Sequence, residues 1–259
     1  MYIAHQIKQQ LKHTFKAQYW RGFGVHSPFV YHLVRHVITT RQRDKDLRRE
    51  ARKYRRQLES DPRVIDIVDY GTGHDRSRSV ADIARAASVN EKYGLMLARI
   101  IAEYKPKKII ELGTSLGIST FYLAKRTQTV IDTIEGCPSC AQRAQEQLSL
   151  FGVPNVRSHV GTFDAVLPSL LTDNEEDIFV FIDGNHTYEA TMRYFDLIAR
   201  HISGRAILVF DDIHWSPSMT QAWDAIVADP RVMTAVELRK MGLAIFRQGC
   251  QKEYYRLRW

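Results

Sequence analysis

Two apolar runs of the sequence end in carboxylates. Asp183 ends FVFID, and Asp211 and Asp212 end ILVFDD. His186 and His214 stand two or three residues beyond these acids. If the two runs are neighbouring strands of a parallel sheet, their carboxyl ends meet at one edge of a cleft and bring the three carboxylates together. Three oxygen ligands with room for water suit Mg²⁺ or Mn²⁺ rather than Zn²⁺, so we expect Asp183, Asp211 and Asp212 to bind a divalent metal.

A metal at such a site activates a hydroxyl nucleophile. The cation binds the oxygen of an alcohol or phenol and lowers its pKa, and a nearby base then takes the proton. The candidate catalytic residues are Asp183, His186 and His214. The sequence leaves plainer alternatives open: a histidine at the start of a helix often caps or packs there, and Asp183 could orient a substrate while Asp211 and Asp212 simply end a strand.

A glycine-containing loop, ELGTSLGIST, follows an earlier apolar run at residues 111–120. Gly113 and Gly117 have a GxxxG spacing, so the GxGxxG dinucleotide fingerprint is not met. Glycines let the backbone approach a ligand closely, and the N-terminus of a following helix offers amides. The next apolar run ends in Glu135 and Gly136, where a carboxylate can accept hydrogen bonds from both hydroxyls of a ribose. A dinucleotide and an adenosyl ligand would use that carboxylate alike.

A second loop, DYGTG at residues 69–73, also follows an apolar run and competes for the same role. Two helical segments follow it, with no second strand that ends in an acid. A motif counts only in its expected surroundings, so we favour the loop at 111–120 as the nucleoside site. The loop at 69–73 is expected to connect elements or to cover a substrate.

Segment order predicts the elements that position these residues. Short apolar runs alternate with helix-period segments from residue 107, which predicts an α/β fold: a doubly wound, Rossmann-like, mostly parallel sheet of seven strands. Only three residues join the last two runs, too few for a parallel crossover, so the last strand should be antiparallel in a hairpin. The predicted strands are 107–112, 129–135, 155–160, 177–183, 206–212, 232–238 and 242–247.

The first 60 residues read as a basic helical extension with a break at 22–28, serving as a lid or a dimerisation arm. They carry 14 Lys and Arg against 4 Asp and Glu, whereas the remainder carries 23 against 25. The densest run, 41–57, could meet nucleic acid or an acidic membrane face, but its interspersed acids favour a solvated helix. Residues 61–106 are expected to form a loop (69–79) and helices (80–87 and 90–104) that lead into the core at 107–259.

Composition excludes several other classes. No apolar run of the 259 residues approaches the roughly 18–20 needed to span a bilayer, and the N-terminal residues do not read as a signal peptide. Three cysteines are too few for a disulfide framework, so a cytoplasmic location is expected. Cys137 and Cys140 form a single CxxC, which without a second pair favours a structural role over zinc binding.

Five motifs, ELGTSLGIST, TIEG, VGTFDAVLPSL, FVFIDGNHTYE and LVFDDIHW, occur in an order that resembles class I S-adenosylmethionine-dependent methyltransferases. The similarity is strongest to the metal-dependent O-methyltransferases of the catechol O-methyltransferase type and to the branch with a D-G-x-H signature. In that family the positions of Asp183, Asp211 and Asp212 hold the metal. The cofactor-binding residues that the resemblance implies are Glu111, Gly113, Ser115, Gly117, Glu135, Gly136, Gly161, Thr162, Phe163 and Asp183. Phe163 departs from the family, where a small polar residue is common beside the adenine.

The resemblance implies an enzyme that transfers a methyl group from S-adenosylmethionine to a hydroxyl oxygen of a small molecule, with Mg²⁺ or Mn²⁺ assistance. One alternative is a nucleic-acid methyltransferase that uses the basic N-terminal arm, although no [DN]PP[YF] tetrapeptide and no RNA-binding module are recognisable. Another is a non-catalytic adenosyl-binding protein, against which the acids at every expected strand end argue. We expect a small-molecule acceptor, no nucleic-acid partner, no membrane span, and a homodimer through the N-terminal helices.

Overall fold

The computed structural model describes residues 5–6, 9, 19–20, 24–40, 44–68, 76–86 and 89–259. They divide into two compact units, each described by itself below. We call residues 40–170 the central unit, and residues 1–39 with 171–259 the terminal unit. The domain boundaries at 60 and 106 stay a prediction, and the loop at 69–73 lies outside the described residues.

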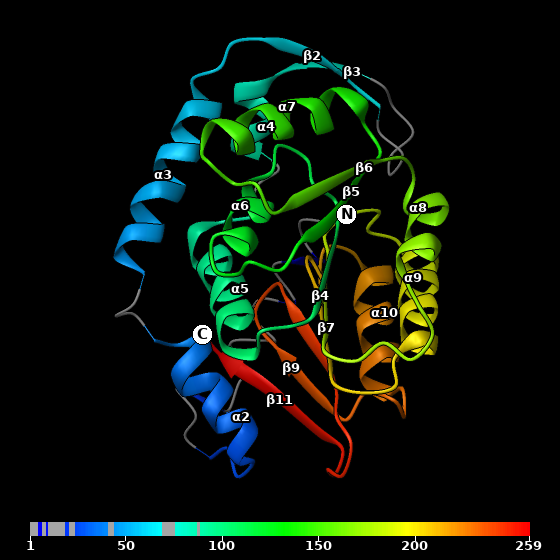
Figure 1. The fold of residues 1–259 in the computed structure, drawn as a ribbon. Coiled ribbons are helices and arrows are strands. Elements are labelled where there is room, and N and C mark those ends of the chain that lie inside the picture. The colour runs from blue at the N-terminus through cyan, green and yellow to red at the C-terminus, as the bar shows by residue number, and fades with distance from the viewer. Residues whose placement is uncertain are drawn as a thin grey trace. The chain divides into compact units, whose positions relative to one another are not determined.

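Three parallel strands form the sheet of the central unit, in the order β4–β5–β6. Parallel neighbours need a crossover connection, and here a helix follows each strand. The strands are β4 (Lys108–Leu112), β5 (Ile131–Glu135) and β6 (Val156–Val160), and the helices are α6 (Ile118–Ala124), α7 (Pro138–Leu150) and α8 (Phe163–Leu170). These strands confirm the runs predicted at 107–112, 129–135 and 155–160 (Figure 1).

Three helices and a strand pair precede this sheet in the central unit. The helices are α3 (Lys45–Glu59), α4 (Val80–Ala86) and α5 (Glu91–Tyr104), and the antiparallel pair is β2 (Val64–Ile67) with β3 (Arg76–Ser79). Asn90 caps α5 by accepting a hydrogen bond from the Tyr93 amide at 3.1 Å. The loop predicted at 69–79 is wrong for Arg76–Ser79, because pairing with β2 makes a strand of a segment whose own sequence, RSRS, has no apolar alternation.

Helix α3 is amphipathic. Its buried residues, Leu47, Ala51, Tyr54 and Leu58, recur every three or four positions and therefore share one face. That face packs against α4, α5 and α6. Residues 45–57 of the densest basic run thus lie in a helix of the central unit (Figure 1). The apolar face of this helix is buried, and its charged residues are exposed or half-buried.

The sheet of the terminal unit has the strand order β1–β11–β9–β10–β8–β7. Strands β7 and β8 are parallel, and β10 runs antiparallel to both β8 and β9, which confirms the predicted hairpin. The strands are β7 (Ile178–Ile182), β8 (Ala206–Phe210), β9 (Thr234–Glu237) and β10 (Gly242–Phe246), and all of their residues are buried. Helices α9 (Tyr188–His201) and α10 (Pro217–Ala228) follow β7 and β8 and lie side by side (Figure 1).

Two strands of the terminal unit were not predicted. Strand β11 (Glu253–Arg258) pairs in parallel with β9, and β1 (Tyr19–Trp20) pairs in parallel with β11. β1 corrects the expectation of an all-helical N-terminal segment, where the described helices include α2 (Pro28–His32) and a π-helix (Leu33–Ile38). The sequence of β11, EYYRLR, is half charged, so pairing with β9 decides its structure.

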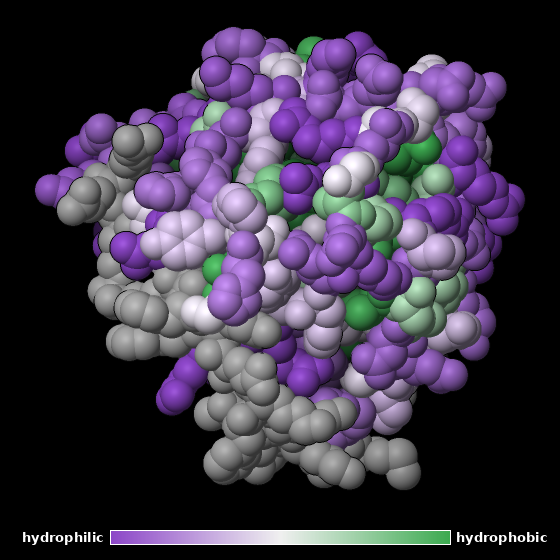
Figure 2. Space-filling view, turned by 90° about the horizontal axis from the view of Figure 1, so that it is seen from below, coloured by the Kyte–Doolittle hydropathy of each residue, from purple (hydrophilic) through white to green (hydrophobic). Residues whose placement is uncertain are grey.

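Hydrophilic residues predominate on the face of the molecule shown in Figure 2, and hydrophobic residues occur there in small separate patches. Within the part of the chain that the structure describes, no helix is both long and apolar enough to cross a membrane.

Candidate functional site

The glycine loop between β4 and α6 has a specialised backbone. Gly113, Ser115 and Gly117 all have positive φ angles, of 104°, 47° and 75°. The Gly113 amide donates to the carbonyl of Ile134 at 3.0 Å, which ties the loop to the end of β5. A Cβ at residue 117 would meet the Tyr54 hydroxyl at 2.8 Å, so glycine is required there both for its φ and for space.

Tyr54 on α3 supports this loop and was missed in the sequence. Its side chain is 1% exposed, and its hydroxyl donates to the carbonyl of Leu116 at 3.0 Å. Helical spacing of the apolar residues in α3 signals that Tyr54 is buried. It does not signal what Tyr54 touches, since Leu116 lies 62 residues further along the chain.

Glu111, at the end of β4, is fully buried. Its Oε2 accepts hydrogen bonds from the hydroxyls of Thr120 at 2.5 Å and Thr133 at 2.7 Å. Its Oε1 is buried without a hydrogen-bond partner among the described residues. Burial raises the pKa of Glu111 to about 7, against the opposing effect of the hydroxyls. A buried carboxylate oxygen without a partner fits a cationic ligand group, such as the ammonium of an amino acid moiety.

Glu135, at the end of β5, joins three segments of the central unit. Its Oε2 accepts from the Ser115 amide at 2.7 Å, its Oε1 from the Cys137 amide at 2.9 Å, and its carbonyl from the Gly161 amide at 3.0 Å. Burial raises the pKa of its carboxyl, and the amide donors oppose this rise. Each carboxylate oxygen has a second lone pair, so Glu135 can still accept bonds from ligand hydroxyls.

The segment after β6 completes this group. Gly161 has a φ of 154°, and Thr162 caps α8 by accepting from the Ala165 amide at 3.3 Å. Phe163, the first residue of α8, is half-buried. The predicted cofactor residues from Glu111 to Phe163, including Gly136, therefore lie at the carboxyl ends of three adjacent parallel strands. Asp183 belongs to the terminal unit, so its predicted contact with the cofactor stays a prediction.

The three predicted metal ligands also come together, within the terminal unit. Ile182 and Phe210 are opposite each other in the β7–β8 register, so Asp183 and Asp211 follow at the same edge. The Asp211 amide donates to the Ile182 carbonyl at 2.9 Å. Asp211 is 3% exposed, and its burial, together with the charges of Asp183 and Asp212, raises its pKa to about 7.

Lys240 joins these acids, and sequence reasoning missed it. Its Nζ lies 2.8 Å from Asp211 Oδ2 and 3.8 Å from Asp212 Oδ1. The other oxygen of Asp211, Oδ1, accepts from the Asp212 amide at 2.8 Å. Among the residues that the structure describes, no group of three or more His, Cys, Asp or Glu side chains is placed to hold a metal ion. Asp183 and Asp211 follow neighbouring strands at the same edge of the sheet, but as they stand the three acids do not fit a resident divalent ion.

The two candidate histidines have different surroundings. His186 Nε2 lies 3.7 Å from Asp183 Oδ1, and the ring is half-buried. His214 has both ring nitrogens engaged: Nδ1 lies 3.2 Å from Thr220 Oγ1, and Nε2 lies 3.3 Å from Glu237 Oε1. The surroundings of His186 leave it better suited to take a proton from a substrate, whereas those of His214 are typical of a structural residue.

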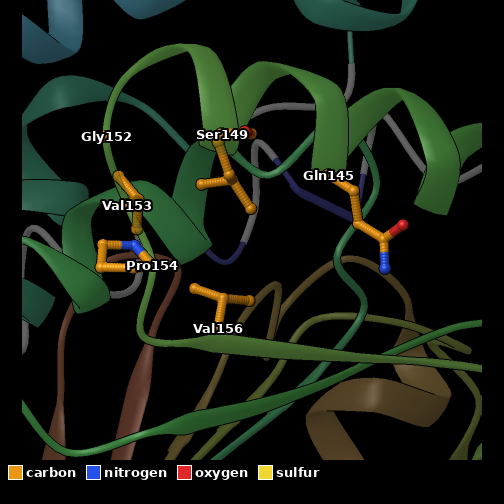
Figure 3. Close-up of a pocket in the computed structure, with 7 residues that line it drawn as sticks. Gln145, Ser149, Gly152, Val153, Pro154 and Val156 are labelled. Atoms are coloured by element: carbon orange, nitrogen blue, oxygen red, sulfur yellow. The ribbon is translucent and has the colours of Figure 1, made fainter.

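A hollow elsewhere in the central unit has a different character (Figure 3). It has a volume of about 470 Å³ and is lined by Gln145 and Ser149 of α7, by the loop 152–154 and by Val156. Val156 begins β6, whereas Gly161 follows its end, so this hollow lies at the opposite end of the strand from the predicted cofactor residues. Its lining has no charged side chain.

Comparison with known proteins adds to this geometry. Residues 110–213 match a family model described as a methyltransferase domain. That range contains the glycine loop, Glu135 and all three acids of the cluster. The chain is also 31% identical over 133 residues to the uncharacterized protein R132 of Acanthamoeba polyphaga mimivirus. That match spans 46% of this chain and 59% of the viral protein's length.

Several solved structures have the same fold. The O-methyltransferase TomG of Streptomyces achromogenes, in complex with SAM, matches with a TM-score of 0.54 and 23% identity over 62% of this chain and 82% of its own. The methyltransferase PaMTH1 of Podospora anserina, bound to SAH, matches with a TM-score of 0.58 and 16% identity over 78% and 88%. An O-methyltransferase of Bacillus cereus in complex with SAH matches with a TM-score of 0.54 and 20% identity over 62% and 84%.

These likenesses confirm the predicted fold class, a Rossmann-like, mostly parallel sheet with helices. Residues 110–213 thus match a methyltransferase domain, and the fold of the chain is that of the O-methyltransferases from Streptomyces achromogenes and Bacillus cereus.

Proposed function

We propose that this protein transfers a methyl group from S-adenosylmethionine to a hydroxyl oxygen of a small molecule. The observation that carries the proposal is the methyltransferase family match over residues 110–213, which includes both groups of candidate site residues. Two of the structurally similar proteins are O-methyltransferases in complex with SAM or SAH, which supports oxygen as the atom that is methylated.

The central unit supplies the cofactor side of the proposed reaction. When bound, S-adenosylmethionine supplies an electrophilic methyl group on a sulfonium. Glu111 would bind the cationic amino acid end through its buried Oε1, which has no partner among the described residues. Glu135 would accept the ribose hydroxyls, and the amides held by Gly113 and Gly117 would approach the ligand closely.

The terminal unit supplies the acceptor side. His186 would take the proton of the acceptor hydroxyl, and Asp183, 3.7 Å away, would orient the ring and stabilise its charged form. Removal of that proton raises the nucleophilicity of the oxygen. A positioned base contributes typically 10²–10⁴-fold in rate.

The sequence also predicts that a divalent metal assists the reaction. A divalent ion would bind the acceptor oxygen and lower its pKa. Lys240 lies beside Asp211 and Asp212, so the proposed proton transfer is assigned to His186 without a metal-bound step. A small-molecule acceptor, a homodimer through the N-terminal helices and a cytoplasmic location likewise stay predictions.

Calorimetry of the whole chain with S-adenosylhomocysteine tests the cofactor half of the proposal, and we expect one site. Absence of binding to both S-adenosylhomocysteine and S-adenosylmethionine would overturn it. A screen of catechols, phenols and sugars with labelled S-adenosylmethionine, with and without Mg²⁺, tests the acceptor half. We expect label in an ether product.

A further inference from the structure

The cation nearest to the acidic cluster belongs to the protein itself. Lys240 Nζ lies 2.8 Å from Asp211 Oδ2, and Asp211 is 3% exposed. Asp212 Oδ1 is 3.8 Å from the same nitrogen, and the charge of Asp183 also acts on it. The lysine side chain therefore neutralises part of a cluster of three carboxylates.

The backbone holds Lys240 at this place. Gly242 is opposite Phe210 in the β8–β10 register, so the turn before Gly242 passes over the residues that follow β8. The Ile213 amide donates to the Lys240 carbonyl at 3.0 Å, which fixes the turn to the loop that carries Asp211. The turn itself is closed by the bond from the Leu238 amide to the Met241 carbonyl at 2.8 Å.

Charge balance explains why a cation is needed there. Adjacent carboxylates at a buried strand end repel each other, and a buried carboxylate without a cation is costly. A divalent metal and a lysine ammonium both meet this need, but they compete for the same oxygens. Asp211 Oδ1 accepts from an amide and Oδ2 from Lys240.

We propose that Lys240 is the resident cation of the cluster of Asp183, Asp211 and Asp212, in the place for which the sequence predicts a divalent metal. The inference rests on the proposed function only in treating this cluster as the acceptor side. On that basis Lys240 is a positioning residue: its ammonium holds Asp211 and Asp212 and makes the site independent of added metal. Its test measures metal binding, not methyl transfer.

Titration with MnCl₂, followed by the electron paramagnetic resonance signal of free Mn²⁺, tests the proposal on the whole chain. We expect wild type and Lys240→Arg to leave Mn²⁺ free at millimolar concentration. Lys240→Met removes the ammonium while keeping an unbranched side chain only one atom shorter, and it should bind Mn²⁺ at least tenfold more tightly. Adding Asp211→Asn to Lys240→Met should abolish that gain, which assigns the binding to this cluster.

Two results would overturn the proposal: Mn²⁺ binding by wild type as tight as that by Lys240→Met, or no gain in Lys240→Met once its circular dichroism shows a folded protein. If Lys240→Met does not fold, Lys240→Gln replaces it. If neither folds, the wild-type titration decides, since tight binding refutes a resident lysine and its absence supports one. Calorimetry with S-adenosylhomocysteine reports separately on the proposed function.

Discussion

The carboxyl of Glu111 is costly to ionise in the folded protein, yet it is suited to bind a cationic ligand group. Its carboxylate is fully buried, and one of its oxygens has no hydrogen-bond partner among the described residues. Burial holds its pKa near 7, so at neutral pH the folded protein bears the cost of an ionised buried group. Such a cost is reasonable where a ligand supplies the missing cation.

Replacing the carboxyl of Glu111 tests both its effect on stability and its predicted role in cofactor binding. Because the folded pKa of Glu111 lies above its unfolded value, ionisation lowers stability as pH rises from about 4.5 to 7. Glu111→Gln should therefore raise the free energy of unfolding at pH 8 by about 1–3 kcal/mol, with a smaller gain at pH 5. It should also weaken S-adenosylhomocysteine binding at least tenfold. Thermal unfolding at both pH values and calorimetry measure the two effects.

The exposed Glu103→Gln is the charge-matched control and should change neither quantity appreciably. A Glu111→Gln variant that binds cofactor as tightly as wild type would remove Glu111 from the cofactor site.

The two histidines should separate activity from stability. His186→Ala should lower kcat/KM by about 10²–10⁴-fold for the acceptor found in the screen, with little change in melting temperature. His214→Ala removes contacts to Thr220 and Glu237, so it should destabilise the fold by about 1–3 kcal/mol. The pH profile of kcat/KM measures the loss of activity, and melting curves measure the loss of stability. His26→Ala, at an exposed position, is the control. An unchanged kcat/KM in His186→Ala would remove its role as the base.

At the scale of elements, α3 acts on the glycine loop through one hydroxyl. Tyr54 crosses from the buried face of α3 to the carbonyl of Leu116, beside Gly117. Part of the basic face of the same helix is paired within the central unit: Arg48 and Arg52 share Glu91, and Arg55 pairs with Glu59. Helix α3, which lies within the segment predicted as a lid or dimerisation arm, therefore supports the loop of the predicted cofactor residues.

Removing that hydroxyl should loosen the loop. Tyr54→Phe keeps the buried ring but leaves the Leu116 carbonyl without its side-chain donor, which should cost about 1 kcal/mol of stability. Because the loop is then less well held, cofactor affinity should fall about two- to tenfold. Calorimetry measures the affinity, and Tyr31→Phe, with a ring that is 45% exposed, is the control. Unchanged affinity in Tyr54→Phe would limit α3 to a packing role.

Strand β11 is fixed to the terminal unit through Glu237 of β9. This residue is 1% exposed and accepts hydrogen bonds from Arg256 at 2.6 Å and from the Trp223 indole at 3.2 Å. Burial raises its pKa, but hydrogen bonds from His214, Arg256 and Tyr254 outweigh burial and hold the pKa well below its usual range.

Because the pKa of Glu237 is lowered in the folded protein, its contribution to stability should decrease as pH falls. The stabilising contribution of Glu237 is present above its unfolded pKa, near 4.3, and is lost as pH falls toward its folded value. Glu237→Gln should therefore lose about 2–4 kcal/mol of stability at pH 7, and its deficit against wild type should shrink below about pH 4. Urea unfolding at pH 7 and pH 3.5 measures this. A deficit that is equal at both pH values would exclude the ionised carboxylate as its cause, and exposed Asp224→Asn is the control.

At the scale of the whole molecule, the net charge is +8, and the excess lies in the first 60 residues. Such a balance favours anionic partners in general. Several of the basic side chains in α3, however, pair with acids of the same unit. We therefore expect no strong nucleic-acid binding.

Binding of a labelled single-stranded RNA at 50 mM and 200 mM salt tests this expectation. A dissociation constant above about 10⁻⁴ M at the lower salt is expected, because few phosphates would be neutralised. Affinity in the nanomolar range that falls steeply with salt would favour the nucleic-acid alternative. Lysozyme, a basic protein without such a function, serves as the control for non-specific charge.

The strands of the parallel core, the glycine loop and the acids could all be located from the sequence. These follow from local patterns: buried parallel strands read as apolar runs, and ligand-binding residues stand at their carboxyl ends. The family resemblance supplied the expected role of each residue, which no local pattern contains.

Which side chains meet could not be read from the sequence, because it is set by how the elements pack. Lys240 lies beside Asp211 because an antiparallel register brings the β9–β10 turn to the end of β8, and neither segment encodes that register alone. Tyr54 reaches Leu116, and β11 becomes a strand, through contacts distant along the chain. Hydrophobic periodicity specifies which face of an element is buried, but the partner on that face is fixed only when the elements pack.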